Sequence, residues 1–437
     1  MFKTLADAFK IKEVRNKLIL TLVLLFIYRL GCWLPIPGIS TEAFQSGTEN
    51  NSFLSLLSLV SGGALSQGAF LALGVSPYIT ASIIIQLLSA IIPSWQKLAK
   101  EGGADGRKKI SQYTKIAALI LAIAQAIGIA VGFGAADMTK LDVFGGNQYV
   151  CYAFIVTMLV AGSMFTVWLG EKITEIGIGN GMSLLIFVGV LSSAGSTIAN
   201  NFSNIGSSDP KVVQSAIWYL ILFVVALIAI FALVVFVDGG ERRVGVQYAK
   251  QMKGRKMYGG QSTYIPVRVN ANGVMPIIFA SAILTFPQLI MSVFSPNSTN
   301  KFITWWNTWL GAGSWLYAIV MSLLILAFAY FYTMLNFDTE QISRQIQQNG
   351  GFITGIRPGK PTADYLSSIN KKVTLFGAIF LAFMALIPTL VFRWIAGPGI
   401  TSAFSATGML IVVSVALEFN KQLEAQLMMR NYRGFLK

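Results

Sequence analysis

Long apolar runs alternate with shorter polar stretches that contain glycine or proline along the whole chain. LILTLVLLFIY and YLILFVVALIAIFALVVFV are two of these runs. A helix that crosses a bilayer needs about 20 mostly apolar residues, so the pattern predicts an all-α polytopic membrane protein. We expect ten transmembrane helices, at residues 18–34, 71–92, 114–133, 150–169, 182–199, 216–237, 273–293, 315–337, 373–392 and 401–419.

The segment Leu56 to Gln67, LLSLVSGGALSQ, is apolar but has only about half the length of a span. Gly62 and Gly63 interrupt it, and we expect them to act as hinges behind a short helix. The next apolar run carries Pro77, which begins a helix readily but disturbs a helix interior. Irregular backbone at membrane depth is tolerated where protein buries it or where it lines a watery cavity. The sequence therefore predicts a broken second span beside an internal cavity.

Composition supports a membrane protein, and the distribution of charge predicts its orientation. Of the 437 residues 54% are hydrophobic and 12% charged, and the mean hydropathy is +0.65; soluble domains carry about 25% charged residues. The net charge of +15 is compatible with nucleic acid or an anionic surface as a partner. However, 28 of the 33 Lys and Arg residues lie in the two tails and in alternate loops. Both termini are therefore expected in the cytoplasm. We expect the first span to be retained, because no small-x-small cleavage site follows it.

Ten spans with both termini on one side divide most simply into two five-helix halves of opposite orientation. The N-terminal half is expected at residues 1–199, an external hinge loop at 200–215 and the C-terminal half at 216–437. Two cytoplasmic loops, 238–272 and 338–372, are far longer than a connection needs. In the first, RRVGVQYA and STYIPVRV flank a GRK tip and predict a β-hairpin. The second predicts a short polar helix, a Gly-Gly break and a Pro/Gly-rich tip. They are either docking surfaces or solvated connectors that set the topology.

Motifs for catalysis are missing from the sequence. It has no histidine, GxxxxGK[ST], CxxC or HExxH, and GIGNG at residues 177–181 precedes an apolar span and predicts a turn. We therefore expect no catalytic residue, metal or cofactor, and the chain is not expected to be an enzyme. Cys32 and Cys151 are the only cysteines. A disulfide between them is possible, but packing roles are favoured.

The span interiors hold almost no ionisable residue, with Arg29 and Glu418 near span ends as exceptions. A secondary transporter, which also has inverted repeats and broken helices, usually keeps such a residue at the membrane midplane. An intramembrane enzyme would need a nucleophile and a base. The sequence favours a passive pore driven by an external motor over both alternatives.

Five long motifs point to one family: GALSQGAFLALGVSPYITASIIIQLL, EGGADGRKKISQYTKIAALILAIAQA, LGEKITEIGIGNGMSLLIF, GRKMYGGQSTYIPVRVNANGVMPIIFASAILTFP and GGFITGIRPGKPTADYL. They closely resemble the SecY family, over essentially all ten spans and both long loops. The resemblance implies a central pore between the two halves, in the bacterial cytoplasmic membrane. It also implies a protein-conducting channel that passes secretory polypeptides across the membrane and releases membrane segments sideways into lipid. The implied partners are SecE, SecG, SecA, the ribosome, the translocating polypeptide with its signal peptide, and membrane lipid.

The resemblance also assigns residues. It implies a plug at residues 54–67, with Leu56, Leu57, Leu59, Val60, Gly62, Gly63 and Leu65. It implies an apolar pore ring of Val75, Ile79, Met182, Ile186, Ile278 and Ile411, which would exclude ions by dewetting. Val75 and Met182 stand where the family pattern has isoleucine. Aliphatic residues in a span ordinarily face lipid or a neighbouring helix, so only the motif match nominates these six.

Two further sets follow from the same motif match. Gln86, Gln125, Ser281 and Thr285 would hold a lateral gate closed through interhelical hydrogen bonds, with ordinary helix packing as the alternative. Arg255, Lys256 and Arg357 match positions that dock SecA or the ribosome. The two residues at the hairpin tip would contact ribosomal RNA phosphates without reading bases.

Overall fold

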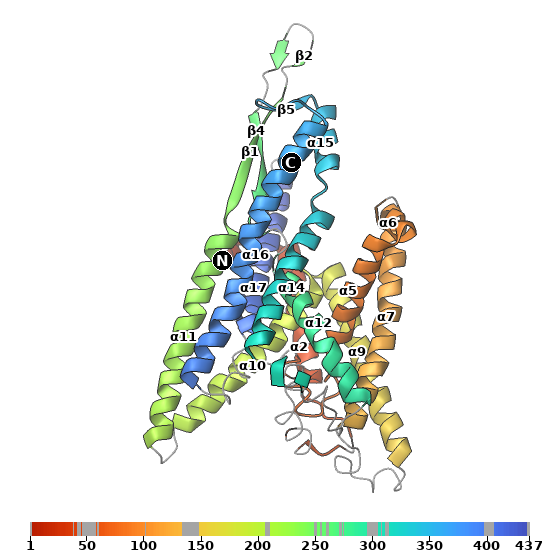
Figure 1. The fold of residues 1–437 in the computed structure, drawn as a ribbon, viewed down its shortest axis with the longest axis vertical. Helices are drawn as coiled ribbons and strands as arrows, with labels where there is room; N and C mark the ends of the chain where they lie inside the picture. The colour runs from red at the N-terminus through yellow and green to blue at the C-terminus, as the bar shows by residue number, and fades with distance from the viewer. Residues whose placement is uncertain are drawn as a thin grey trace.

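The structure is a computed structural model (Figure 1). It describes residues 2–37, 39–41, 45, 58, 61–100, 102–132, 148–205, 210–248, 251–253, 256–258, 262–270, 273, 275–294, 305–306, 308–310, 314–396 and 406–434.

Each of the ten expected ranges overlaps one helix. In chain order these helices are α2 (Lys12–Gly31), α5 (Ser76–Ile91), α7 (Gly103–Gly132), α9 (Gln148–Ile176), α10 (Gly181–Ile205), α11 (Pro210–Asp238), α12 (Met275–Phe294), α14 (Trp315–Asn336), α16 (Lys360–Ala396) and α17 (Ala406–Gly434). Shorter helices between or before them include α1 (Phe2–Lys10), α6 (Pro93–Lys100) and α15 (Thr339–Gln348). Within the described residues, four stretches are long and apolar enough by composition to cross a membrane: Asp105–Ala130, Tyr149–Ile176, Trp315–Gln348 and Lys360–Leu386.

Local chemistry explains where several helices begin. Pro77 lies in the first turn of α5, as its position in the sequence predicts. Ser314 caps α14 by accepting a hydrogen bond from the Tyr317 backbone N–H at 3.2 Å. The GIGNG stretch is the turn between α9 and α10, where Asn180 Oδ1 accepts from the Met182 N–H at 3.1 Å. The sequence-based prediction of a turn there is confirmed.

The helices form two groups that two further helices connect (Figure 1). In one group α7 packs against α5 and α9, and in the other α16 packs against α14 and α17. Helix α12 contacts α5, α7 and α14, whereas α10 contacts α2, α9, α11 and α17. The largest buried apolar cluster draws its side chains from both groups and from these connecting helices.

The predicted β-hairpin is confirmed, and it gains a third strand. Strand β1 (Glu241–Tyr248) pairs antiparallel with β4 (Ser262–Arg268), and β2 (Gln251–Lys253) pairs with β3 (Lys256–Tyr258) toward the tip. The loop after α15 supplies β5 (Gly351–Ile353), which pairs with the other edge of β1 to give the order β4-β1-β5. Strands β1 and β4 run beside one end of α16, and the hairpin tip with β2 projects beyond the long helices (Figure 1). The two long loops therefore form one folded unit rather than two separate connectors.

The predicted break before α5 is confirmed, but its form differs from the expectation. Residues 61–75 form successive turns rather than a helix, so the expected half-length helix is wrong for residues 61–67. Gly62 and Gly63 have φ of +71° and +84°, which a side chain disfavours and which ends a helix. The Gly63 N–H and the Ser61 hydroxyl both donate to the Ser58 carbonyl, at 2.7 and 3.1 Å. Residues 54–57, 59 and 60 lie outside the described residues.

Both cysteines are free and buried, in two different apolar clusters. The packing role that the sequence favoured is confirmed, and the structure has no disulfide between them.

Candidate functional site

The six residues nominated for the pore ring come from four helices that are distant in the sequence. Val75 is the residue before α5 and Ile79 lies in its first turn, Met182 and Ile186 lie in α10, Ile278 in α12 and Ile411 in α17. All six belong to, or pack against, one buried cluster. Val75, Ile186, Ile278 and Ile411 are all below 10% exposed. The structure therefore brings the six together, although nothing in their spacing requires it.

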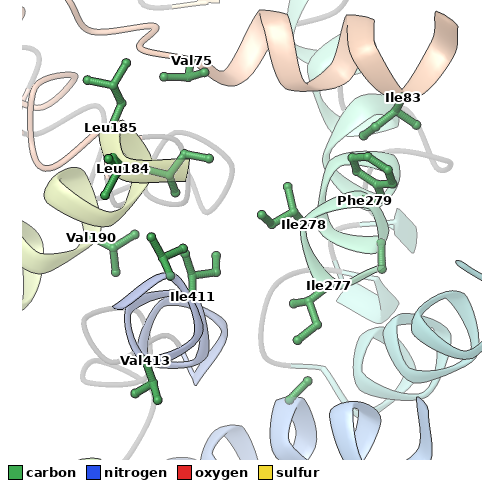
Figure 2. Close-up of a cluster of buried hydrophobic side chains, with 14 of the residues drawn as sticks. Val75, Ile83, Leu184, Leu185, Val190, Ile277, Ile278, Phe279, Ile411 and Val413 are labelled. Atoms are coloured by element: carbon green, nitrogen blue, oxygen red, sulfur yellow. The ribbon is translucent and has the colours of Figure 1, made fainter. Parts of the chain in front are cut away.

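Figure 2 shows this cluster in more detail. Val75, Leu184 and Leu185 lie on one side of the view, and Ile278 and Phe279 lie opposite them on α12. Leu185 and Phe279 are almost completely buried and extend the apolar set beyond the six nominated residues. Because leucine and phenylalanine are common in any span, no signal in the sequence separates them from lipid-facing residues.

Met182 differs from the other five in its surroundings. A methyl group placed on Gly170 of α9 would lie 2.5 Å from Met182 Sδ, so the thioether rests directly on that glycine. This contact holds Met182 against α9 as well as against the cluster. The flexible methionine fills the gap that a glycine leaves between the two helices.

The turn segment before α5 packs into two apolar clusters. Ala64, Ala69 and Leu71 belong to the cluster that holds the ring residues. Leu65 is fully buried in a second cluster with residues of α7 and α9, such as Ala126 and Leu159. The backbone of Phe70 approaches α9 so closely that a methyl group on Gly162 would lie 2.0 Å from its carbonyl oxygen. In addition, the Ser163 hydroxyl donates to the Gly74 carbonyl at 3.3 Å. Protein therefore buries this irregular backbone and satisfies part of its hydrogen bonding.

The polar residues nominated for a lateral gate have separate environments. Gln86 on α5 accepts a hydrogen bond from the Tyr332 hydroxyl on α14. Ser281 donates to the Ile278 carbonyl of its own helix at 2.7 Å, so this hydroxyl satisfies a local partner rather than joining two helices. Gln125 is buried, and its Oε1 has no hydrogen-bond partner in the described part of the chain. Thr285 lies in α12, and its side chain is outside the described residues.

The sheet presents basic and aromatic groups at the end of the molecule. The Arg243 guanidinium lies over the Tyr264 ring at 4.8 Å from its centroid and donates to Glu241 at 2.7 Å. The hydrogen bond from Arg243 to Glu241 raises the pKa of the guanidinium, which is charged at any physiological pH. Of the nominated docking residues, Arg255 lies outside the described residues, as does the side chain of Lys256 on β3.

Arg357 lies in a tight turn between β5 and α16, and its side chain is exposed. The Thr362 hydroxyl donates to the Arg357 carbonyl at 2.9 Å, and the Ser343 hydroxyl donates to the Gly359 carbonyl at 2.7 Å. Both hydroxyl-bearing residues are buried, whereas Gly359 adopts a φ of +100°. Two buried hydroxyl groups therefore fix the backbone of the turn that carries this exposed arginine.

Across the described residues, no group of three His, Cys, Asp or Glu side chains is placed to hold a metal ion. The site is instead an apolar cluster between helices, together with a buried turn segment on one side and a basic sheet at one end.

Comparison with known proteins gives the family. The SecY family model matches residues 69–420. The protein translocase subunit SecY of Bacillus subtilis (strain 168) is 39% identical over 441 residues, which covers all of both chains. The chain belongs to the SecY family. The SecY of Thermotoga maritima is also 39% identical, over all of this chain and 98% of the relative.

Solved structures agree with this SecY fold. A structure described as that of a protein conducting channel superposes with a TM-score of 0.60 at 19% identity, over 94% of this chain and 91% of that chain. Sec61 in the canine ribosome-channel complex from the endoplasmic reticulum gives a TM-score of 0.56 at 18% identity, over the same shares. This SecY-family chain is therefore a mostly helical, multi-pass membrane protein.

Proposed function

We propose that this chain is the channel subunit of a protein-translocation complex. It passes secretory polypeptides across the bacterial cytoplasmic membrane and releases membrane segments sideways into lipid. The channel itself catalyses no reaction, and SecA or the ribosome supplies the driving force.

One observation carries this proposal: the six motif residues, from four helices of both expected halves, meet in a single buried apolar cluster. A narrow throat lined by aliphatic side chains does not hold a continuous water column, so it blocks ions while the channel rests. Aliphatic side chains also adapt their rotamers to the cross-section of a passing chain. The cluster thus has the chemistry of a gasket.

The two halves, residues 1–199 and 216–437, act as the two walls of the pore, with residues 200–215 as their external connection. Both termini and both long loops lie in the cytoplasm, according to the distribution of Lys and Arg in the sequence. The segment at residues 54–67 plugs the outer funnel. Its described part supports this role, because Ser61, Gly62, Ala64 and Leu65 are buried and Ala64 belongs to the ring cluster.

The seam between α5 and α7 on one side and α12 and α14 on the other is the lateral exit. Support comes from the contacts of α12 with α5 and α7, and from the hydrogen bond that joins Gln86 to Tyr332 across the seam. These helix contacts have to be exchanged for contacts with the signal peptide when it enters. Opening therefore costs a modest amount of energy rather than a large one.

The basic sheet and the Arg357 turn dock the cytoplasmic partners, SecA and the ribosome. Two observations support this role. Arg357 is exposed on a turn whose backbone accepts hydrogen bonds from two buried hydroxyl groups. Both long loops also contribute strands to one sheet. The small subunits SecE and SecG complete the complex within the membrane.

The test is reconstitution. The chain is purified with its small partner subunits and placed in vesicles, and SecA, ATP and a secretory precursor are added. We expect the precursor to become protected from external protease only when ATP is present. A failure of protection with a competent motor, together with accumulation of a small solute, would show that the chain is a carrier instead.

A further inference from the structure

Arg29 lies inside the first expected span, and its surroundings are specific. It lies in the last turn of α2, and its Nη1 donates to the Gly62 carbonyl at 2.9 Å. Its guanidinium also lies 5.9 Å from the centroid of the Trp33 ring. Among the described residues, no carboxylate forms an ion pair with Arg29. The hydrogen bond of this charged group is therefore directed at the backbone of the turn segment.

Gly62 is closely approached by Arg29 on one side and by the backbone of α10 on the other. A methyl group added to it would lie 2.8 Å from Arg29 Nη1 and 2.8 Å from the Gly189 carbonyl oxygen on α10. Its φ of +71° turns the chain sharply, and the residue is buried. Gly62 is thus enclosed between the guanidinium of α2 and the backbone of α10.

The Gly62 carbonyl needs a donor at this depth. Three donors of the turn have other partners: the Gly63 N–H and the Ser61 hydroxyl donate to the Ser58 carbonyl, and the Ser66 hydroxyl donates to the Gly63 carbonyl. A buried carbonyl without a partner costs free energy comparable to a lost hydrogen bond. Arg29 supplies this donor as a charged group, which makes the hydrogen bond stronger than a neutral one.

The contact lies next to the ring cluster. Gly189 is three residues after Ile186 on α10, so the two lie on neighbouring parts of one helix face, and Val190 belongs to the cluster itself. We propose that Arg29 is the latch of the resting channel: its hydrogen bond to the Gly62 carbonyl holds the turn segment against α10. This inference rests on the proposed channel function and adds a positioning residue to it.

An arginine in the last turn of a helix also interacts favourably with the helix dipole, wherever its side chain points. The test has to separate this general effect from the specific contact. The glycine pair allows that separation, because Gly62 and Gly63 both have positive φ but only Gly62 touches Arg29. A methyl group on Gly63 would meet only Ser66 Oγ, at 3.9 Å.

The experiment measures how readily the turn segment leaves its place. In the complete complex with Cys32 and Cys151 both replaced by alanine, Ser61→Cys places a thiol at a position that is 3% exposed. The rate of its reaction with a water-soluble maleimide is compared among the parent and the variants Arg29→Gln, Gly62→Ala and Gly63→Ala. Resting ion leak through reconstituted vesicles is measured on the same proteins.

We expect labelling to accelerate about tenfold in Arg29→Gln, the factor set by losing about 1.4 kcal/mol of a charge-assisted hydrogen bond. Gly62→Ala should accelerate labelling at least as much, Gly63→Ala clearly less, and leak should follow the same order. Parent-like labelling in both Arg29→Gln and Gly62→Ala would overturn the latch. If the complex with Arg29→Gln does not assemble, the labelling rates of Gly62→Ala and Gly63→Ala decide. Equal labelling rates in these two variants would overturn the proposed latch.

Failure of the latch and failure of the channel function are distinguishable. Motor-driven import into vesicles of the unmodified complex tests the function alone. If import works and the Arg29 and Gly62 variants label like the parent, the latch proposal is refuted and the channel function still holds.

Discussion

The Tyr332 hydroxyl on α14 donates a hydrogen bond to Gln86 Oε1 on α5, which joins two helices 246 residues apart in the sequence. The same tyrosine ring lies 4.8 Å, centroid to centroid, from Phe279 on α12. One side chain thus connects three of the helices that border the proposed lateral exit. Its hydroxyl and its ring make separate contributions, because phenylalanine keeps the ring contact and loses only the hydrogen bond.

We expect Tyr332→Phe to make the lateral gate easier to open. Loss of one hydrogen bond weakens the closed state by about 1 kcal/mol, which raises the open population roughly fivefold. The measurement is ATP-dependent import of a precursor whose signal peptide has been shortened in its apolar part. Import of this precursor should increase by up to that factor.

Tyr330→Phe on the same helix is the matched control. Its hydroxyl is exposed and bonds to the Lys371 carbonyl at 3.4 Å, within the α14–α16 contact rather than across the seam. Import in this variant should equal that of the parent. The gate role of Gln86 and Tyr332 is refuted if both tyrosine variants behave alike.

Ile278 offers a test of the ring. Replacing this buried side chain by serine introduces a hydroxyl that favours water in the throat, so ions should cross the resting channel more readily. We expect an increase in leak on the order of tenfold, equivalent to about 1.4 kcal/mol. Ile283→Ser, on an exposed face of the same helix, supplies the comparison. Equal leak in the two variants would place the seal elsewhere.

The helices and the hairpin could be predicted from the sequence because their signals are local. Apolar runs of sufficient length mark α11 and α14, Pro77 marks the start of α5, and alternation marks β1 and β4. Strand β5 has no such local signal, because it has only three residues and exists through pairing with a distant strand. The apolar pattern of residues 61–75 predicts helix in part where the structure has turns, since an apolar run alone does not distinguish a helix from buried irregular backbone.

The candidate site was less accessible to sequence reasoning. Val75 and Ile278 could be named only through the motif match, and Leu185 and Phe279 carry no signal that sets them apart from lipid-facing residues. A signal for Tyr332 did exist, because a hydroxyl inside an apolar span must find a partner. Its partner Gln86 was named for its polarity, but the pairing depends on how α5 and α14 pack.

Close helix packing around Gly162 predicts a large effect of a single methyl group on stability. In Gly162→Ala the new Cβ would lie 2.0 Å from the Phe70 carbonyl oxygen, so the backbone of the turn segment must shift. We expect a loss of about 1–3 kcal/mol and a lower Tm. The assay is thermal unfolding of the purified complex with a thiol-reactive dye, since Cys32 and Cys151 are both buried until the protein unfolds.

Gly195→Ala on α10 is the control for this prediction. Nothing lies within 4 Å of a methyl group there, and alanine is favoured over glycine in a helix by up to about 1 kcal/mol. Its Tm should stay equal or rise. A Tm of Gly162→Ala equal to or higher than that of Gly195→Ala would contradict the close approach of α9 and the turn segment.

The Arg357 turn predicts a docking defect from substitution of a buried residue, Thr362. Thr362→Val removes the hydroxyl that donates to the Arg357 carbonyl while it keeps the size of the side chain. Loss of about 1 kcal/mol of support lets the turn sample other conformations, so we expect SecA to bind roughly fivefold more weakly. Arg357→Glu should abolish docking, because it reverses the charge on the turn.

Thr354→Val, an exposed threonine of the same loop, should leave the Kd unchanged. Measurement of SecA binding to the reconstituted complex in all three variants separates support of the turn from a general effect of valine. An unchanged Kd in Thr362→Val would mean that the turn keeps its shape without the hydroxyl, and that the adjacent Ser343 contact with Gly359 suffices.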